Sequence, residues 1–381
     1  MKNKNSTGFS LKDQLFNREK VEYLAGLFRA SDHRFDVSGF VAKTMSQLSQ
    51  LELKERITHI ATVLEVHLDS DFRIAAEQIV AALPPPLDPN RTDNDFGEFI
   101  IAPLGQFVVR NGLEEKNLRL SLKTLKAITM RFSMEDAIRA FINAHPTKTL
   151  KELERWSTDS NYHVRRLVSE GTRPLLPWSG RLSIDRSEPM RLLDALHADP
   201  TRYVTRSVAN HLNDISKQDA QLVLETLSRW QQEGRQAEEE LQWMINHSLR
   251  TLIKRGHSET MQFLGFATSP KIQVTDFLLQ PGRVQAGEAF EFSLTIQAKR
   301  DETLVVDYVI DFVKAGGKRS PKVHKLKQLR LERGESATIR KKHLLRADAT
   351  TYRLYPGIHT VTIQINGQPF GQQSFELLPT S

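Results

Sequence analysis

Two stretches of the chain, DSNYHVRRLVSEG at residues 159–171 and DPTRYVTRSVANH at residues 199–211, align with each other at an offset of 40 residues. The alignment pairs Arg166 with Arg206, and a fainter third copy, NHSLRTLIKRG, lies at residues 246–256. Each copy has the three- and four-residue apolar spacing of an amphipathic helix. A period near 40 residues, built from helix pairs, is the signature of HEAT-like repeats that stack into a solenoid.

Equivalent positions of stacked repeats line up along one surface, so the repeat predicts a row of side chains. The row consists of Arg166, Arg206 and Arg250, each followed one helical turn later by Glu170, Asn210 and Lys254 respectively. Glu170 is then an acid within a row of positive charge, and neighbouring cations should hold its pKa low. The alternative is that each arginine only pairs with an acid or a helix end inside the solenoid.

The apolar period changes from helical to strand-like in the last third of the chain. Up to about residue 265, segments such as AQLVLETLSRWQQ have helical spacing, whereas AFEFSLTIQAK and HTVTIQIN alternate with a period of two. We predict a multidomain protein, with an all-α HEAT-like helical-repeat solenoid over residues 1–268. An all-β immunoglobulin-like sandwich over residues 269–381 follows it.

Composition excludes several classes of protein. The 381 residues contain no cysteine, which excludes a disulfide scaffold and a thiolate metal site. No secretory signal and no apolar run near the roughly 18 residues of a membrane span is present, so we expect a cytoplasmic protein without membrane contact. The sequence around His163 and His247 does not have the spacing of metal ligands, and we expect no metal ion. The net charge of +7 is compatible with a polyanionic partner.

Several motifs together resemble those of one family. They are NYHVRRLVSEGTRPLLPW (161–178), RYVTRSVANHLNDISK (202–217), NHSLRTLIKRGH (246–257), RFSMEDAIRAFI (131–142) and YPGIHTVTIQINGQPFGQQSFEL (355–377). In combination and at repeat spacing they are similar to the AlkC-type DNA alkylation repair glycosylases, which belong to a HEAT-like superfamily. The resemblance covers nearly the whole chain, including the immunoglobulin-like tail.

The resemblance implies a monofunctional DNA glycosylase of base excision repair. Its substrates would be cationic N3-alkylated bases, 3-methylcytosine and 3-methyladenine, in double-stranded DNA, reached without full base extrusion. It implies no cofactor, and a protein associated with the bacterial nucleoid. Nothing in the sequence suggests an obligate oligomer, so we expect a monomer.

The resemblance also assigns catalytic residues. The acid of the SEGTRP segment is Glu170, and a second acid, in the RFSMEDAIRAF segment, is Glu135. A carboxylate near the anomeric carbon can stabilise an oxocarbenium-like sugar and position a water. Trp178 would stack on the lesion or the sugar. The alternatives are that Glu135 only complements a helix dipole and that Trp178 is a core residue.

Basic and amide side chains of the repeats are candidates for phosphate contact, because arginine and lysine neutralise phosphates regardless of sequence. These candidates are Arg165, Arg166, Arg173, Arg206, Asn210, Arg250 and Lys254. Asp214 is expected to have a structural role instead.

A second basic region lies in the predicted β domain. Residues 314–346 contain twelve basic and two acidic side chains. Lys322, Lys325 and Lys327 belong to KVHKLKQLRL, whose alternation predicts that its basic side chains share one sheet face. We expect a second contact with DNA here; the alternative is that the lysines protect a sheet edge against aggregation.

Two other functions remain open. One is a non-catalytic HEAT-repeat scaffold that binds DNA or protein, and the other is a protein-binding solenoid with an adhesion-like β domain. An intact motif around Glu170 favours the enzyme.

Overall fold

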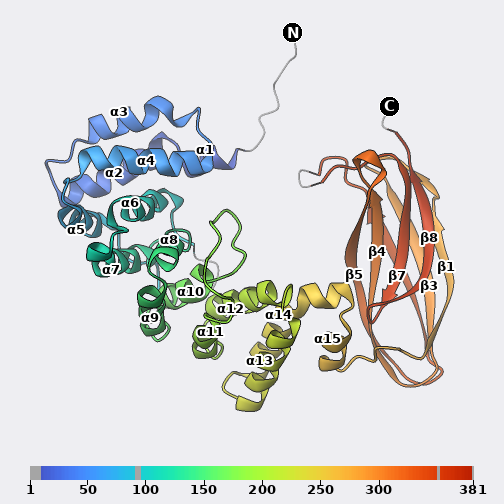
Figure 1. Ribbon diagram of the computed structural model, residues 1–381. Coiled ribbons are helices and arrows are strands. Elements are labelled where there is room, and N and C mark those ends of the chain that lie inside the picture. The colour runs from blue at the N-terminus through green and yellow to red at the C-terminus, as the bar shows by residue number, and fades with distance from the viewer. Residues whose placement is uncertain (1–9, 91–95, 350–351, 380–381) are drawn as a thin grey trace, which may run out of the picture. The chain divides into compact units, whose positions relative to one another are not determined.

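The computed structural model describes residues 10–90, 96–349 and 352–379. Within these residues helices come first and strands follow, as the colours of Figure 1 trace. The last helix before the strands ends at Phe263, and the first strand begins at Ile272. The predicted fold class, helical repeats followed by a β-sandwich, is confirmed.

The helices pack against their neighbours along the chain. For example, α10 contacts α7, α9 and α11. The helices are α1 (Leu11–Leu15), α2 (Arg18–Ser31), α3 (Val37–Leu48), α4 (Leu53–His67), α5 (Phe72–Ala82), α6 (Ala102–Gly112), α7 (Leu118–Thr129), α8 (Ala137–Ala144), α9 (Pro146–Trp156), α10 (Tyr162–Gly171), α11 (Met190–Leu196), α12 (Arg202–Ser216), α13 (Ala220–Glu233), α14 (Glu238–Arg255) and α15 (Ser258–Phe263), with short 3-10 helices η1 (Phe99–Ile101) and η2 (Glu115–Asn117). None of the helices in the described part of the chain has the length and apolar character needed to span a bilayer.

The strands form two sheets, ordered β1-β3-β6 and β2-β8-β7-β4-β5. They are β1 (Ile272–Gln280), β2 (Arg283–Val284), β3 (Ala289–Ala298), β4 (Glu302–Val313), β5 (Arg319–Leu331), β6 (Ser336–Leu344), β7 (Gly357–Ile365) and β8 (Gln368–Leu377), with the 3-10 helix η3 (Ala315–Gly317) between β4 and β5. Alternate residues of β3, β4 and β7, among them Phe290, Ile310 and Ile363, are fully buried in one core. The period of two in the sequence thus marks the inner faces of the sheets.

An irregularity in β5 separates its lysines. Lys322 and Lys327 pair with core-facing residues of β4, whereas Lys325 pairs with Asp307 on the opposite face. Leu326 has no partner in this register, and the extra residue reverses the side-chain alternation. The prediction that the basic side chains of this strand share one face is therefore wrong.

The chain divides into two compact units. One contains the residues up to Ile215 together with Leu227–Ser248, and the other contains Ser216–Thr226 together with the residues from Leu249 onward. The division thus cuts within α12, α13 and α14. The domain boundary between residues 268 and 269 stays a prediction.

Within the second compact unit, the end of α14 contacts the β7–β8 turn through two glycines. Gly256 and Gly367 both have positive φ, and a Cβ on Gly256 would lie 2.5 Å from the Cα of Gly367. No other residue fits at either position without a backbone shift. Beside them, the Asn366 amide donates to the Ala267 carbonyl at 3.0 Å, and its oxygen accepts from the Val305 N–H at 2.8 Å.

Candidate active site

Helix α10 carries two predicted site residues one turn apart. Its first turn is capped by Asn161, whose side chain accepts from the His163 N–H at 2.9 Å. Leu167 is buried in the core, but the polar side of the helix is also enclosed, since Arg166 and Glu170 are only 7% and 5% exposed. Such side chains need partners within the protein, because burying an unpaired charge is costly.

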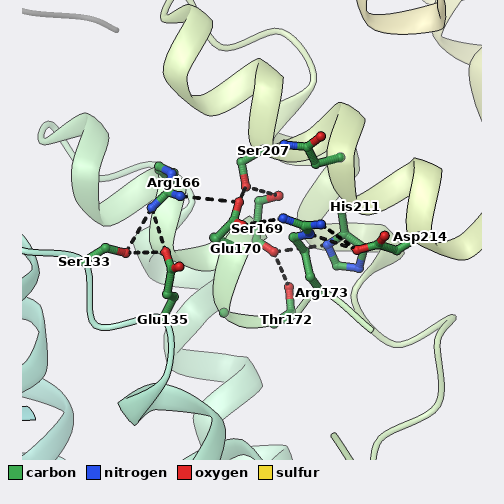
Figure 2. A network of polar contacts seen from close by, with 12 residues as sticks. Ser133, Glu135, Arg166, Ser169, Glu170, Thr172, Arg173, Ser207, His211 and Asp214 are labelled. Carbon is green, nitrogen blue, oxygen red and sulfur yellow. Dashed lines mark hydrogen bonds and ion pairs between the residues drawn. The ribbon is translucent and has the colours of Figure 1, made fainter. Parts of the chain in front are cut away.

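Those partners form a chain of alternating charge, which Figure 2 shows running from Glu135 to Asp214. Arg166 donates to Glu135 Oε2 at 2.9 Å, and its second terminal nitrogen lies 3.6 Å from Glu170 Oε2. Arg173 donates to Glu170 Oε1 at 2.5 Å and to Asp214 Oδ2 at 2.9 Å. Three carboxylates thus alternate with two guanidiniums along this network.

Both oxygens of Glu170 are engaged, since Oε2 also accepts from the Ser207 hydroxyl at 2.6 Å. Burial by itself raises the pKa of Glu170, but the charges of Arg166 and Arg173 outweigh it and hold the pKa below its ordinary value. The hydrogen bonds from Ser207 and Arg173 act in the same direction. Glu170 is therefore ionised at neutral pH, as expected for an acid among cations.

Glu135 is the more accessible of the two predicted catalytic acids. It lies just before α8, and its side chain is 30% exposed, against 6% for that of Glu170. The Ser133 hydroxyl donates to Glu135 Oε2 at 2.8 Å, so this contact and that of Arg166 fall on the same oxygen. Within the residues that the structure describes, Glu135 Oε1 carries no hydrogen bond from the protein.

Aromatic rings cover Arg166. Its guanidinium carbon lies 4.5 Å from the centre of the Tyr203 ring and 5.8 Å from that of Phe96. The Tyr203 hydroxyl is buried and has no hydrogen-bond partner among the described residues. Phe96, which sequence reasoning missed, is 50% exposed, and a large apolar side chain held half in solvent over a charged site is a candidate for ligand contact.

His211 supports the helix end that carries Glu170. Its Nδ1 lies 3.1 Å from the carbonyl oxygen of Ser169, to which it can donate. Burial, with help from the charge of Arg173, lowers the pKa of His211 to about 4. The imidazole is therefore neutral at neutral pH.

Trp178 lies in the α10–α11 loop and is 79% exposed, so the alternative of a core tryptophan is wrong. The loop forms a turn in which the Ser179 N–H donates to the Leu176 carbonyl at 3.3 Å, with Pro177 before Trp178. Trp178 has a φ of +73°, a left-handed conformation that costs a residue other than glycine about 1–3 kcal/mol. Strain and exposure at one aromatic residue together point to a functional role.

Like Arg166, the predicted phosphate contacts Arg165 and Arg173 have partners inside the protein. Arg165 pairs with Asp199 at 2.5 Å, and its side chain is 14% exposed. Arg173 is 11% exposed and bridges Glu170 and Asp214. Contact of these arginines with DNA stays a prediction, as it does for Arg166.

The other members of the predicted row lie on α12 and α14. Arg206 and Asn210 are half-buried on α12, and the Asn210 side-chain oxygen lies 2.8 Å from His247 Nε2. Arg250 and Lys254 are on α14 in the second compact unit. Contact with DNA stays a prediction for all four residues, Arg206, Asn210, Arg250 and Lys254.

The lysines of β5 are exposed, and their contact with DNA is likewise a prediction. The ammonium of Lys322 lies 4.7 Å from the centre of the Tyr352 ring. Lys325 lies beside Asp307, whose pKa burial raises to about 6 although the charge of Lys325 opposes this rise.

Comparison with known proteins agrees with this architecture. The family model "Uncharacterised protein YhaZ, C-terminal Ig-like domain" matches residues 273–379. The uncharacterized protein YhaZ of Bacillus subtilis (strain 168) is 32% identical over 368 residues, which make up 96% of this chain and 98% of that protein. The structure of Pseudomonas fluorescens alkylpurine DNA glycosylase AlkC, bound to DNA containing an abasic site analogue, is 33% identical. It superposes with a TM-score of 0.87 and covers 97% of this chain and 100% of that chain.

The fold and the site thus define a HEAT-like helical-repeat protein with a carboxyl-terminal immunoglobulin-like domain. The chain belongs to the family that contains YhaZ and AlkC. The resemblance to the AlkC type predicted from the sequence is confirmed.

Proposed function

We propose that this protein is a monofunctional DNA glycosylase that removes cationic N3-alkylated bases, 3-methylcytosine and 3-methyladenine, from double-stranded DNA. One observation carries the proposal. Two carboxylates, Glu135 and Glu170, are joined through Arg166 in one network, in a chain similar along nearly its whole length to an alkylpurine DNA glycosylase.

The chemistry of such a base makes modest demands on the enzyme. A base alkylated at N3 carries a positive charge and leaves without protonation by a general acid. The remaining tasks are to stabilise positive charge on the sugar as the N-glycosidic bond breaks and to position a water for attack. Both tasks suit ionised carboxylates.

The two acids differ in surroundings, and we assign them different tasks. Glu170 is ionised and fixed at both oxygens, so it supplies a constant negative field. Glu135 is more exposed, and no hydrogen bond from the described residues reaches its Oε1, so Glu135 can accept a proton from an attacking water. Arg166 donates to Glu135 and lies beside Glu170, which fixes the separation of the two acids.

Other side chains serve recognition in this proposal. Trp178 projects from its loop and contacts the lesion or its sugar, where an aromatic face favours a cation. The duplex is held by basic residues that bind phosphates irrespective of sequence. Of the predicted contacts, Lys254, Lys322 and Lys327 have exposed side chains, so we assign them first. We further propose a monomer that acts on the nucleoid in the cytoplasm without a cofactor.

The decisive experiment uses two duplexes, each with a single modified base, 3-methylcytosine in one and 3-methyladenine in the other. The protein is incubated with each, and the released base and the abasic site are measured. An unmodified duplex and the Glu170→Gln variant serve as controls. Binding of duplex DNA without release of either base would favour the non-catalytic scaffold. No salt-sensitive binding at all would favour the protein-binding solenoid.

A further inference from the structure

One arginine spans the loop that carries Trp178. Arg139 of α8 donates from Nε to the Gly180 carbonyl at 2.8 Å. Its Nη1 donates to the carbonyls of Gly171 and Arg173 at 3.1 and 2.7 Å. Gly171 and Arg173 precede Trp178 and Gly180 follows it, so a single guanidinium contacts the backbone on both sides of Trp178.

Asn143, one helical turn after Arg139, holds the next part of the same loop. Its amide donates to the Arg181 carbonyl at 2.9 Å, and its oxygen accepts from the Ser183 N–H at 2.9 Å and the Ser183 hydroxyl at 3.1 Å. Residues four apart project from one side of a helix, so α8 presents both side chains to the loop.

The same helix is also tied to the predicted catalytic acids. Glu135 lies just before the start of α8. Gly171, which follows Glu170 at the end of α10, packs so closely against α8 that a Cβ on Gly171 would lie 2.5 Å from Ile138. Arg139 is 3% exposed, so its planar fork is fixed rather than free to sample other partners. A rigid α8 therefore connects Glu135 at its start with the Trp178 loop along its side.

We propose that Arg139 is a positioning residue, which holds the Trp178 loop in its projecting shape before DNA binds and sets Trp178 at a fixed place relative to Glu135. The expected effect of Arg139 on excision rests on the proposed glycosylase function, whereas the contacts of Arg139 with the loop do not depend on it. This positioning role explains how a strained, exposed tryptophan is held in place: three carbonyl contacts and the Asn143 contacts hold the backbone on both sides of Trp178.

The first test measures the loop without reference to activity. Trypsin can cleave after Arg181, whereas cleavage after Arg173 is blocked by the following Pro174. Arg139→Met removes all three carbonyl contacts, and cleavage after Arg181 under native conditions should accelerate about tenfold or more, because proteolysis follows the population of the open loop. Arg139→Lys can reach fewer carbonyls at once, so its rate of cleavage after Arg181 should lie between those of Arg139→Met and the wild type.

A matched control comes from another buried arginine. Arg56 is 1% exposed and donates to the carbonyls of Leu51, Lys12 and Phe16. Arg56→Met loses three carbonyl contacts of the same kind, and also the ion pair of Arg56 with Asp13, far along the chain from the loop. It should leave both cleavage after Arg181 and the rate of excision unchanged at a temperature where the protein is folded.

The second test measures excision with enzyme in excess. Arg139→Met should lower the single-turnover rate at saturation about 10- to 100-fold, while the dissociation constant for unmodified duplex stays within about twofold. Because Arg139 acts through Trp178, adding Arg139→Met to Trp178→Ala should produce no further loss. If Arg139 had a purely structural role independent of Trp178, the fold losses in excision rate of the two single variants would multiply in the double variant.

The outcomes separate the two proposals. Unchanged trypsin cleavage in Arg139→Met, or multiplying losses in the double variant, would overturn the positioning role. If the wild type releases no base from either modified duplex, the glycosylase proposal fails, and the trypsin result alone decides whether Arg139 holds the loop. Should Arg139→Met fail to fold, Arg139→Lys carries both tests with smaller effects.

Discussion

Replacing Glu170 by glutamine removes one charge from the centre of the alternating chain and keeps the shape of the side chain. Glu170 accepts from Arg173 at 2.5 Å and from Ser207 at 2.6 Å, with Arg166 at 3.6 Å. After the substitution Arg173 still pairs with Asp214, and Arg166 keeps its contact with the second acid. Neither arginine is left without a carboxylate.

This arrangement sets the expected loss of stability. Leaving a buried ion without a partner of opposite charge costs about 3–5 kcal/mol, and this cost does not arise here because both arginines keep a carboxylate. Two hydrogen bonds to a carboxylate contribute about 1.5–3 kcal/mol each; after the substitution the one from Arg173 keeps only the charge of its donor, and the one with Ser207 becomes a neutral bond of about 1 kcal/mol. Glu170→Gln should therefore lower the free energy of unfolding by about 2 kcal/mol. Glu135→Gln, at a 30% exposed side chain, should lower it by about 1 kcal/mol or less.

The assays are urea unfolding and single-turnover excision at neutral pH. Excision by Glu170→Gln should fall at least about 100-fold, since a fixed charge that stabilises the transition state is lost. Duplex affinity should hold or rise, because a negative charge has been removed from the DNA-binding protein. Glu135→Gln should also lose excision, with less effect on stability.

The pH dependence gives an independent check. The folded-state pKa of Glu170 is lower than its unfolded value, so its stabilising effect is present above the unfolded pKa of about 4.3. The effect is lost as the pH falls through the folded pKa, and the stability gap between wild type and Glu170→Gln should narrow below about pH 4.3. A gap that stays constant down to pH 3, or wild-type excision by Glu170→Gln, would refute this account of Glu170.

Three further predictions concern binding and strain. Arg206→Ala should weaken binding to any duplex and reduce the slope of log affinity against log salt by about one unit; an unchanged slope would make Arg206 structural. Trp178→Asn, which tolerates the left-handed backbone, should raise the free energy of unfolding by about 1 kcal/mol while lowering excision, as urea unfolding and base release will test. Lys322→Ala and Lys327→Ala should each weaken duplex binding in a titration more than Lys325→Ala does, because Lys325 lies beside Asp307. Equal losses would contradict this order.

The repeat in the sequence was sufficient to predict the helical fold and one contact of the site. Arg166 and Glu170 are four residues apart on a helix, and their side chains do meet. The position of Glu135 beside them followed only from the family resemblance, since no local pattern links residues 31 positions apart. Asp214 forms an ion pair with Arg173, and the structural role expected for Asp214 stays a prediction.

Other features could not be read from the sequence because they depend on tertiary placement. Phe96 stands in a polar segment with no periodicity, and only the packed structure brings its ring over Arg166. Arg139 has the pattern of a helical surface residue, yet it is buried by the loop that it holds. The irregularity at Leu326 reverses an alternation that the sequence alone predicts to continue.

The protonation states of the site bear on which lesions it could remove. At neutral pH Glu170 is ionised and His211 is neutral, with a pKa of about 4, so neither holds an acidic proton to give to a leaving base. An uncharged base would need such a proton, because its anion is a poor leaving group. A base alkylated at N3 needs none, and the ionised carboxylate of Glu170 complements the positive charge of both the base and the developing sugar cation. In the proposed glycosylase, these protonation states therefore favour cationic lesions over uncharged ones.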